Sequence, residues 1–197
     1  MKPKDDLHRG ERIRTDEGLV LRRSLHSETD VRLTIFLRQY GKVMATAKAG
    51  CQFQSRLKVL LEPFSDVDIQ IFLPEHRSFG RLIGGRLKRS YPHLRKNVKI
   101  YQRACQCCET LDLLLPSRAP SQDLFDLLKT TLSHLDQGAD PDLAWMWFVA
   151  QLLKLTGHGD HSAHVRDPQK HSMTFLESRL EEILPRKLKS LVPLSEV

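Results

Sequence analysis

The sequence predicts an α+β protein in which a small five-stranded β-barrel precedes an all-helical domain. Apolar residues recur with a period of two between about residues 17 and 90, and with a period of about 3.6 after Tyr91-Pro92. We therefore expect a disordered N-terminal extension over residues 1–14, a barrel over residues 15–90 and a helical domain over residues 91–197. The chain of 197 residues with 40% hydrophobic content can bury a core without disulfides.

Five segments of the first region have the alternation of half-buried strands. In one of them Val31, Leu33 and Ile35 alternate with polar or charged neighbours. The five segments cover residues 19–25, 31–38, 41–48, 66–71 and 79–87. Gly41-Lys42 marks a tight hairpin, and Gly84-Gly85 marks a bulge of the kind that lets a small sheet close. This pattern favours an OB-fold, although an SH3-like barrel fits the pattern nearly as well.

Four helices are expected in the second region. The first ends at Pro116, the second covers about residues 122–135, and the third begins at Asp140-Pro141, where the aspartate is a good N-cap. The fourth starts near Thr174 and ends before Pro185. On the first helix the predicted buried stripe, which leaves Cys107 pointing elsewhere, consists of Leu94, Val98, Tyr101, Cys105, Cys108, Leu111 and Leu115.

Positive charge is concentrated in the first half of the chain. The net charge of +7 divides into +10 over residues 1–100 and −3 over residues 101–197. A polyanion such as DNA or RNA is therefore expected to bind the first half, with an affinity that falls steeply with salt. The four cysteines, the lack of an export signal and an apolar run no longer than Leu143–Leu153 indicate a cytoplasmic protein that does not cross a membrane.

Cationic side chains surround the predicted barrel. A barrel of this kind binds single strands by combining such charges with aromatic rings on which bases stack. Phe36, Tyr40 and Phe53 are the candidate rings. The predicted DNA-binding side chains are Arg22, Arg23, Arg38, Lys42, Lys48, Arg56, Lys58, Arg86, Lys88 and Arg89.

Several short motifs, in order and spacing, resemble the RecO family of bacterial recombination mediators. The N-terminal ones are GLVLRR from Gly18, SETD from Ser27, YGK from Tyr40, SRL from Ser55 and LEPF from Leu61. Weaker similarity continues through Tyr91-Pro92, Leu111–Leu115, Leu124–Leu128 and the segment Arg186–Leu191. The resemblance therefore spans most of the chain after residue 14.

The resemblance implies an OB-fold followed by a helical domain, binding of single- and double-stranded DNA, and annealing of complementary strands. It also implies partnership with RecR and single-stranded-DNA-binding protein, which helps to load RecA, in the cytoplasm at the nucleoid. No catalytic residue and no cofactor are expected. The matched positions make Arg22, Arg38, Lys42, Lys48, Arg56 and Lys58 the best candidates for phosphate contacts.

One segment departs from the family pattern. Where relatives carry a four-cysteine zinc module, this chain has GHGDHSAHVRDPQKHSM over residues 157–173, so the helical domain lacks the usual module. The histidines of this loop leave open a metal-dependent hydrolase, although their spacing matches no standard zinc pattern. An RNA-binding accessory factor is the other alternative, because a basic barrel does not distinguish DNA from RNA.

Overall fold

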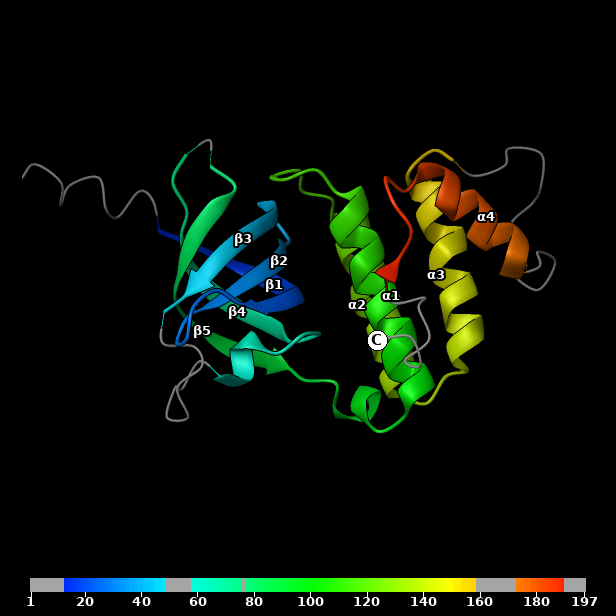
Figure 1. Cartoon of the computed structure of the whole chain (residues 1–197), viewed down its shortest axis with the longest axis horizontal. Helices are drawn as coiled ribbons and strands as arrows, with labels where there is room; N and C mark the ends of the chain where they lie inside the picture. Colours follow the sequence, from blue (N-terminus) through cyan, green and yellow to red (C-terminus); the bar gives the residue numbers. More distant parts are fainter. Residues whose placement is uncertain (1–12, 49–57, 76, 159–172, 190–197) are drawn as a thin grey trace, which may run out of the picture. The chain divides into compact units, whose positions relative to one another are not determined.

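The computed structural model of the protein describes residues 13–48, 58–75, 77–158 and 173–189 (Figure 1). The chain forms two compact units, each described here by itself. The first contains the strands up to Ser90 together with residues 116–121, and the second contains the rest of the chain from Tyr91. Whether the sequence-based regions 15–90 and 91–197 fold independently stays a prediction.

The first unit is a closed barrel of five strands. Its strands are β1 (Ile13–Leu25), β2 (Val31–Leu37), β3 (Gly41–Ala47), β4 (Asp66–Phe72) and β5 (Phe79–Arg89). They close in the order β1-β2-β3-β5-β4, with every pair antiparallel except the short parallel pair of β3 and β5. A 3-10 turn, Lys58–Leu61, precedes β4. The barrel confirms the expected OB-fold.

The barrel core consists of the inward side chains that the alternation predicts. Leu33, Ile35 and Val43 are buried with Ile69 and Ile71 in one cluster. The expected bulge is present in β5, because Gln70 pairs with Gly84 while Ile71 pairs with Leu82, which leaves Ile83 without a partner across the ladder.

The first strand is longer than predicted. β1 begins at Ile13 and pairs with β4 from Ile13↔Phe72 onwards, so the expectation of disorder is wrong for residues 13 and 14. Residues 1–12 lie outside the described residues. The sequence did not indicate this part of the strand because Arg14-Thr-Asp-Glu17 breaks the apolar alternation, whereas the ladder to β4 supplies the stabilising hydrogen bonds.

A buried carboxylate fixes the turn between β2 and β3. Asp16 accepts hydrogen bonds from the backbone amides of Glu17 (2.8 Å), Gln39 (2.8 Å) and Tyr40 (3.3 Å). Burial of the carboxyl raises the pKa of Asp16, and the three amides act in the opposite direction. The residue therefore ties β1 to the hairpin from which β3 begins.

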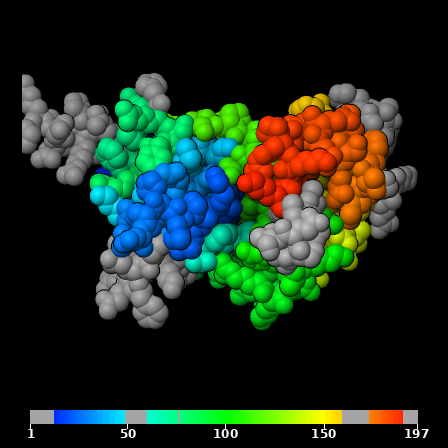
Figure 2. Space-filling view, in the orientation of Figure 1, coloured from blue at the N-terminus to red at the C-terminus, as the bar shows by residue number. Residues whose placement is uncertain are grey.

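The second unit contains α1 (Val98–Leu114), α2 (Gln122–Asp136), α3 (Pro141–Leu155) and α4 (Met173–Ile183). Asp140 caps α3 as predicted, since its Oδ1 accepts from the amides of Asp142 and Leu143 at 2.9 Å. In Figure 2, α4 and the residues after it, orange to red, form a continuous part of this unit's visible surface. None of the described helices is long and apolar enough to span a membrane.

The predicted buried stripe of α1 is partly wrong. Val98 is 69% exposed and Tyr101 is also exposed, whereas Ala104 and Cys107 are fully buried. The spacing of apolar residues predicted burial of Val98 and Tyr101. The buried face of α1 also contains the polar residue Gln106, so the positions of apolar residues alone do not identify this face. Burial raises the pKa of the Cys107 thiol, which keeps it neutral.

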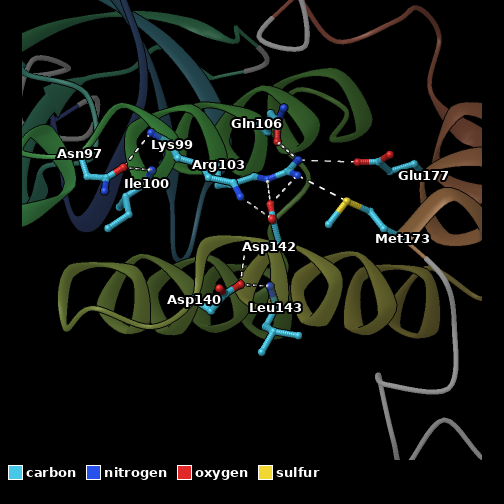
Figure 3. Close-up of polar contacts among 10 residues, drawn as sticks. All are labelled: Asn97, Lys99, Ile100, Arg103, Gln106, Asp140, Asp142, Leu143, Met173 and Glu177. Carbon is cyan, nitrogen blue, oxygen red and sulfur yellow. Dashed lines mark hydrogen bonds and ion pairs between the residues drawn. The ribbon is translucent and has the colours of Figure 1, made fainter.

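Arg103 joins three helices of this unit (Figure 3). From α1 its guanidinium bonds to Asp142 of α3 through Nε (3.1 Å) and Nη2 (2.8 Å), and its Nη1 lies 3.6 Å from Oε1 of Glu177 on α4. Nη1 also donates to Gln106 Oε1 at 2.7 Å, and the guanidinium lies 5.7 Å from the ring centroid of Trp145. This side chain, 13% exposed, therefore acts as an ionic bridge between α1, α3 and α4.

Asp142 should make the stability of this unit depend on acid pH. The hydrogen bond from Lys99 (Nζ–Oδ2 2.6 Å) lowers the pKa of Asp142 below its ordinary 3.8, and Arg103 acts in the same direction. Because the folded-state pKa is lowered, the stabilisation is complete above about pH 5 and is lost as the pH falls through the folded pKa. The free energy of unfolding of the wild type should therefore exceed that of Asp142→Asn by a constant margin at neutral pH.

This margin should shrink towards about pH 3, because the asparagine does not titrate. Denaturant unfolding followed by tryptophan fluorescence measures it, since both tryptophans, Trp145 and Trp147, belong to α3. A difference in unfolding free energy between the wild type and Asp142→Asn that is the same at neutral pH and at about pH 3 would contradict a lowered pKa of Asp142.

Candidate nucleic-acid interface

Three of the predicted cationic side chains form ion pairs on the outside of the barrel. Glu17 of β1 and Asp68 of β4 are direct cross-strand partners. Arg38 Nε lies 3.0 Å from Glu17 Oε2, and Arg86 Nη2 lies 2.7 Å from Asp68 Oδ2. Lys88 Nζ bridges the two carboxylates, at 2.9 Å from Glu17 Oε1 and 3.7 Å from Asp68 Oδ1. We call these five residues the ion-pair strip.

The cations of the ion-pair strip offset the charge of its two carboxylates, and this role makes them less available to bind phosphate. Two carboxylates directly opposite each other in a ladder repel, and Lys88 between them offsets that repulsion. A phosphate approaching Arg38 or Lys88 has to compete with these carboxylates at short distance. Arg86 is the most solvent-exposed of the three cations, at 79%.

A second surface of the barrel combines arginines with an exposed aromatic ring. Arg22, Arg32, Met44, Phe79 and Arg81 form this surface, which we call the arginine–phenylalanine face. Cross-strand pairing sets it out in two parallel rows over β1, β2, β3 and β5, one of Arg22, Thr34, Met44 and Phe79, the other of Ser24, Arg32, Thr46 and Arg81. Neither row contains an acidic residue. Alternation places both rows on the outside, because Leu33, Val43 and Ala45 lie in the core.

Within this face the ring of Phe79 and the side chain of Arg81 are exposed, whereas Arg32 is half-buried. Phe79 is 43% exposed and its cross-strand neighbour Met44 is 38% exposed. The Arg32 guanidinium lies 6.0 Å from the Phe79 ring centroid and donates from Nη2 towards His26 Nδ1 at 2.8 Å. Arg81 is exposed and has no carboxylate partner among the described residues.

The remaining predicted cations are spread around the barrel. Arg23 is half-buried beside Arg22, and Lys48 is exposed just after β3. Lys42 is half-buried, and its carbonyl accepts from the amide of Arg118 at 2.9 Å. Arg89 is exposed at the end of β5. The structure therefore brings the predicted set together in groups rather than in one patch.

Two predicted cations are not placed by the structure. Lys58 begins the 3-10 turn, but its side chain is outside the description. Arg56 lies outside the described residues. Both stay candidates on sequence grounds alone.

The three candidate stacking rings differ in whether the structure describes them and in how exposed they are. Phe36 is fully buried, so its proposed stacking role is wrong. Tyr40 is half-buried and its ring centroid lies 5.9 Å from the Arg14 guanidinium and 5.8 Å from that of Arg118. Phe53 lies outside the described residues. Phe79, which the sequence reasoning missed, is an exposed ring on the arginine–phenylalanine face.

The sequence did contain a signal for Phe79. In β5 the core residues are Gly80 and Leu82, so strict alternation assigns Phe79 and Arg81 to the outside. The histidine loop that left a metal site open lies mostly in 159–172, outside the described residues. Within the described ranges, no group of three or more His, Cys, Asp or Glu residues could hold a metal ion.

Two family models match the chain. The model described as "Recombination protein O N terminal" matches residues 12–91, and "Recombination protein O C terminal" matches residues 101–190. DNA repair protein RecO of Geobacter metallireducens is 34% identical over 75% of this chain and 61% of its own length. The RecO proteins of Exiguobacterium sibiricum (30% identical, 74% of this chain, 57% of the relative) and Geobacter sulfurreducens (31%, 72% and 58%) are also similar. This chain spans about three fifths of the length of these relatives. It belongs to the RecO family.

Proposed function

We propose that this chain is a DNA repair protein that binds single- and double-stranded DNA through its barrel and anneals complementary strands. Family membership supports a repair role, and the arginine–phenylalanine face carries the proposal of DNA binding, because it places the exposed Arg81 beside the exposed ring of Phe79. RecR and single-stranded-DNA-binding protein are the proposed protein partners in loading RecA, and the nucleoid is the proposed location.

Annealing needs no catalytic side chain in this mechanism. Arginines that contact the phosphates of two strands reduce the repulsion between the strands, so that complementary bases can meet and pair. Phosphate contacts carry no sequence information, which suits a protein that anneals any complementary pair. The positions proposed for these contacts are Arg22, Arg32 and Arg81, together with the exposed Lys48.

Replacing Lys48 and Arg81 together by alanine should weaken DNA binding nearly equally for all sequences. Each lost phosphate contact lowers the slope of log affinity against log salt by about 1, so the double variant should lose a slope of about 2 and on the order of 100-fold in affinity at low salt. Fluorescence anisotropy with labelled DNA across a salt series measures both quantities, and strand annealing should slow in parallel.

Arg86→Ala is the matched control. It also removes an exposed arginine from the barrel, but one that is paired with Asp68, so its effect should be much smaller. Wild-type protein that fails to bind DNA at low salt would overturn the proposal. Equal losses in the control and the double variant would move the contacts to the ion-pair strip. Labelled RNA of the same sequence tests the preference for DNA.

A further inference from the structure

Resting on the proposed function, we propose that Phe79 is a base-stacking platform that gives the arginine–phenylalanine face a preference for single strands. A base would stack on the exposed side of the ring, while Arg32 and Arg81 contact the phosphates on either side. The proposal thus names unpaired nucleotides as the ligand of this position.

Phe79 and its neighbours form an exposed apolar surface on which a base can stack. The ring is 43% exposed in a cross-strand pair with exposed Met44, which makes an apolar spot inside a basic surface. Stacking of a base on such an aromatic side chain typically strengthens binding by about 10-fold or more. Arg32 packs against the same ring, with its guanidinium 6.0 Å from the centroid, and so restricts the ring orientation before a ligand arrives.

Charge and hydrogen-bonding capacity favour a nucleic acid over an apolar protein partner. Arg32 lies beside the ring, Arg81 lies two residues further along β5, and neither cross-strand row contains an acidic residue. An apolar partner would leave the exposed guanidinium of Arg81 without hydrogen-bond acceptors, whereas a nucleotide supplies phosphate oxygens that accept from it.

Single and double strands should therefore differ in how they use this face. The arginines can contact the phosphates of either form, but only an unpaired base offers a free face to Phe79. Phe79→Ala should lower affinity for a single strand by about 10-fold and leave duplex affinity and the salt slope unchanged, because stacking releases no counterions.

The deciding experiment compares a normal oligonucleotide with an abasic one of the same length, which keeps the phosphates and lacks the bases. Wild-type protein should bind the normal oligonucleotide more tightly, and Phe79→Ala should abolish that difference. Phe79→Trp should restore it, with quenching of the new tryptophan on binding. Ile83→Ala, on the same strand and 42% exposed, should keep the wild-type difference.

The outcomes separate this inference from the proposed function. If the wild type binds neither oligonucleotide, the proposed function fails. If the wild type binds and Phe79→Ala, folded by circular dichroism, retains the difference, this inference alone is overturned. If Phe79→Ala binds DNA as the wild type does but no longer binds an acidic peptide that the wild type binds, the ring serves a protein partner. That result would also overturn this inference.

Discussion

Substituting methionine for Arg103 is expected to lower the free energy of unfolding of the helical unit by about 3 kcal/mol. The side chain is 13% exposed and bonds to Asp142, Gln106 and Glu177. Methionine fills a similar volume but leaves Gln106 Oε1 without its donor and removes the bridge between α1, α3 and α4. This loss of unfolding free energy is small for the removal of one member of a buried ion pair, because Lys99 still neutralises Asp142 in the variant.

Tryptophan fluorescence reports this loss directly. Both tryptophans belong to α3, and Trp145 Nε1 donates to Glu177 at 3.0 Å beside Arg103. Arg179→Met is the matched control, since Arg179 forms an exposed pair with Glu182 within α4 and its removal should cost less than about 0.5 kcal/mol. A similar loss in both variants would show that Arg103 contributes no more than a surface charge.

Sequence patterns predicted the barrel well because its core is formed by apolar residues at alternate positions of each strand, a pattern that can be read within a few residues. Leu33, Ile35 and Val43 are inward, as alternation requires, and Gly41 with φ of 71° forms the predicted turn. The start of β1 escaped prediction because Arg14 and Glu17 are ordered by pairing with β4, more than fifty residues further along the chain. The burial of α1 escaped it because Gln106 and Arg103 occupy positions that an apolar period excludes.

The basic character of the barrel was predictable, but its division into two surfaces was not. Whether a lysine is available for phosphate depends on its neighbours across the sheet, and Lys88 meets Glu17 only through the register of β1, β4 and β5. Arg81 has no carboxylate partner among the described residues, and its cross-strand neighbour is Thr46. Composition gives the sum of the charges, and register decides which of them are neutralised.

Replacing Gly41 by alanine is expected to destabilise the barrel unit by about 3 kcal/mol. Its φ of 71° already disfavours a side chain, by about 1–2 kcal/mol. A Cβ at this position would also lie 2.5 Å from the carbonyl carbon and 2.7 Å from the amide nitrogen of Ala119. Since both contacts are to backbone, the segment 116–121 has to move away from β3.

The displacement should be visible apart from the loss of stability. Arg118 donates its amide to the Lys42 carbonyl at 2.9 Å, and Lys42 forms a parallel bridge with Ser117. Hydrogen exchange measured by mass spectrometry should therefore speed up over residues 116–121 in Gly41→Ala, even in conditions where the barrel stays folded. Thermal unfolding by circular dichroism gives the accompanying stability change.

Gly138→Ala separates steric displacement from backbone strain. Gly138 has a comparable φ of 90°, but a Cβ there would have no neighbour within 4 Å. Its substitution should therefore cost only the conformational strain of about 1–2 kcal/mol. Equal losses in the two variants, with unchanged exchange over residues 116–121, would mean that the segment does not pack against Gly41 as described. A larger loss in Gly41→Ala, accompanied by faster exchange, follows if the segment is an integral part of the barrel, because its backbone then occupies the space that the new methyl group needs.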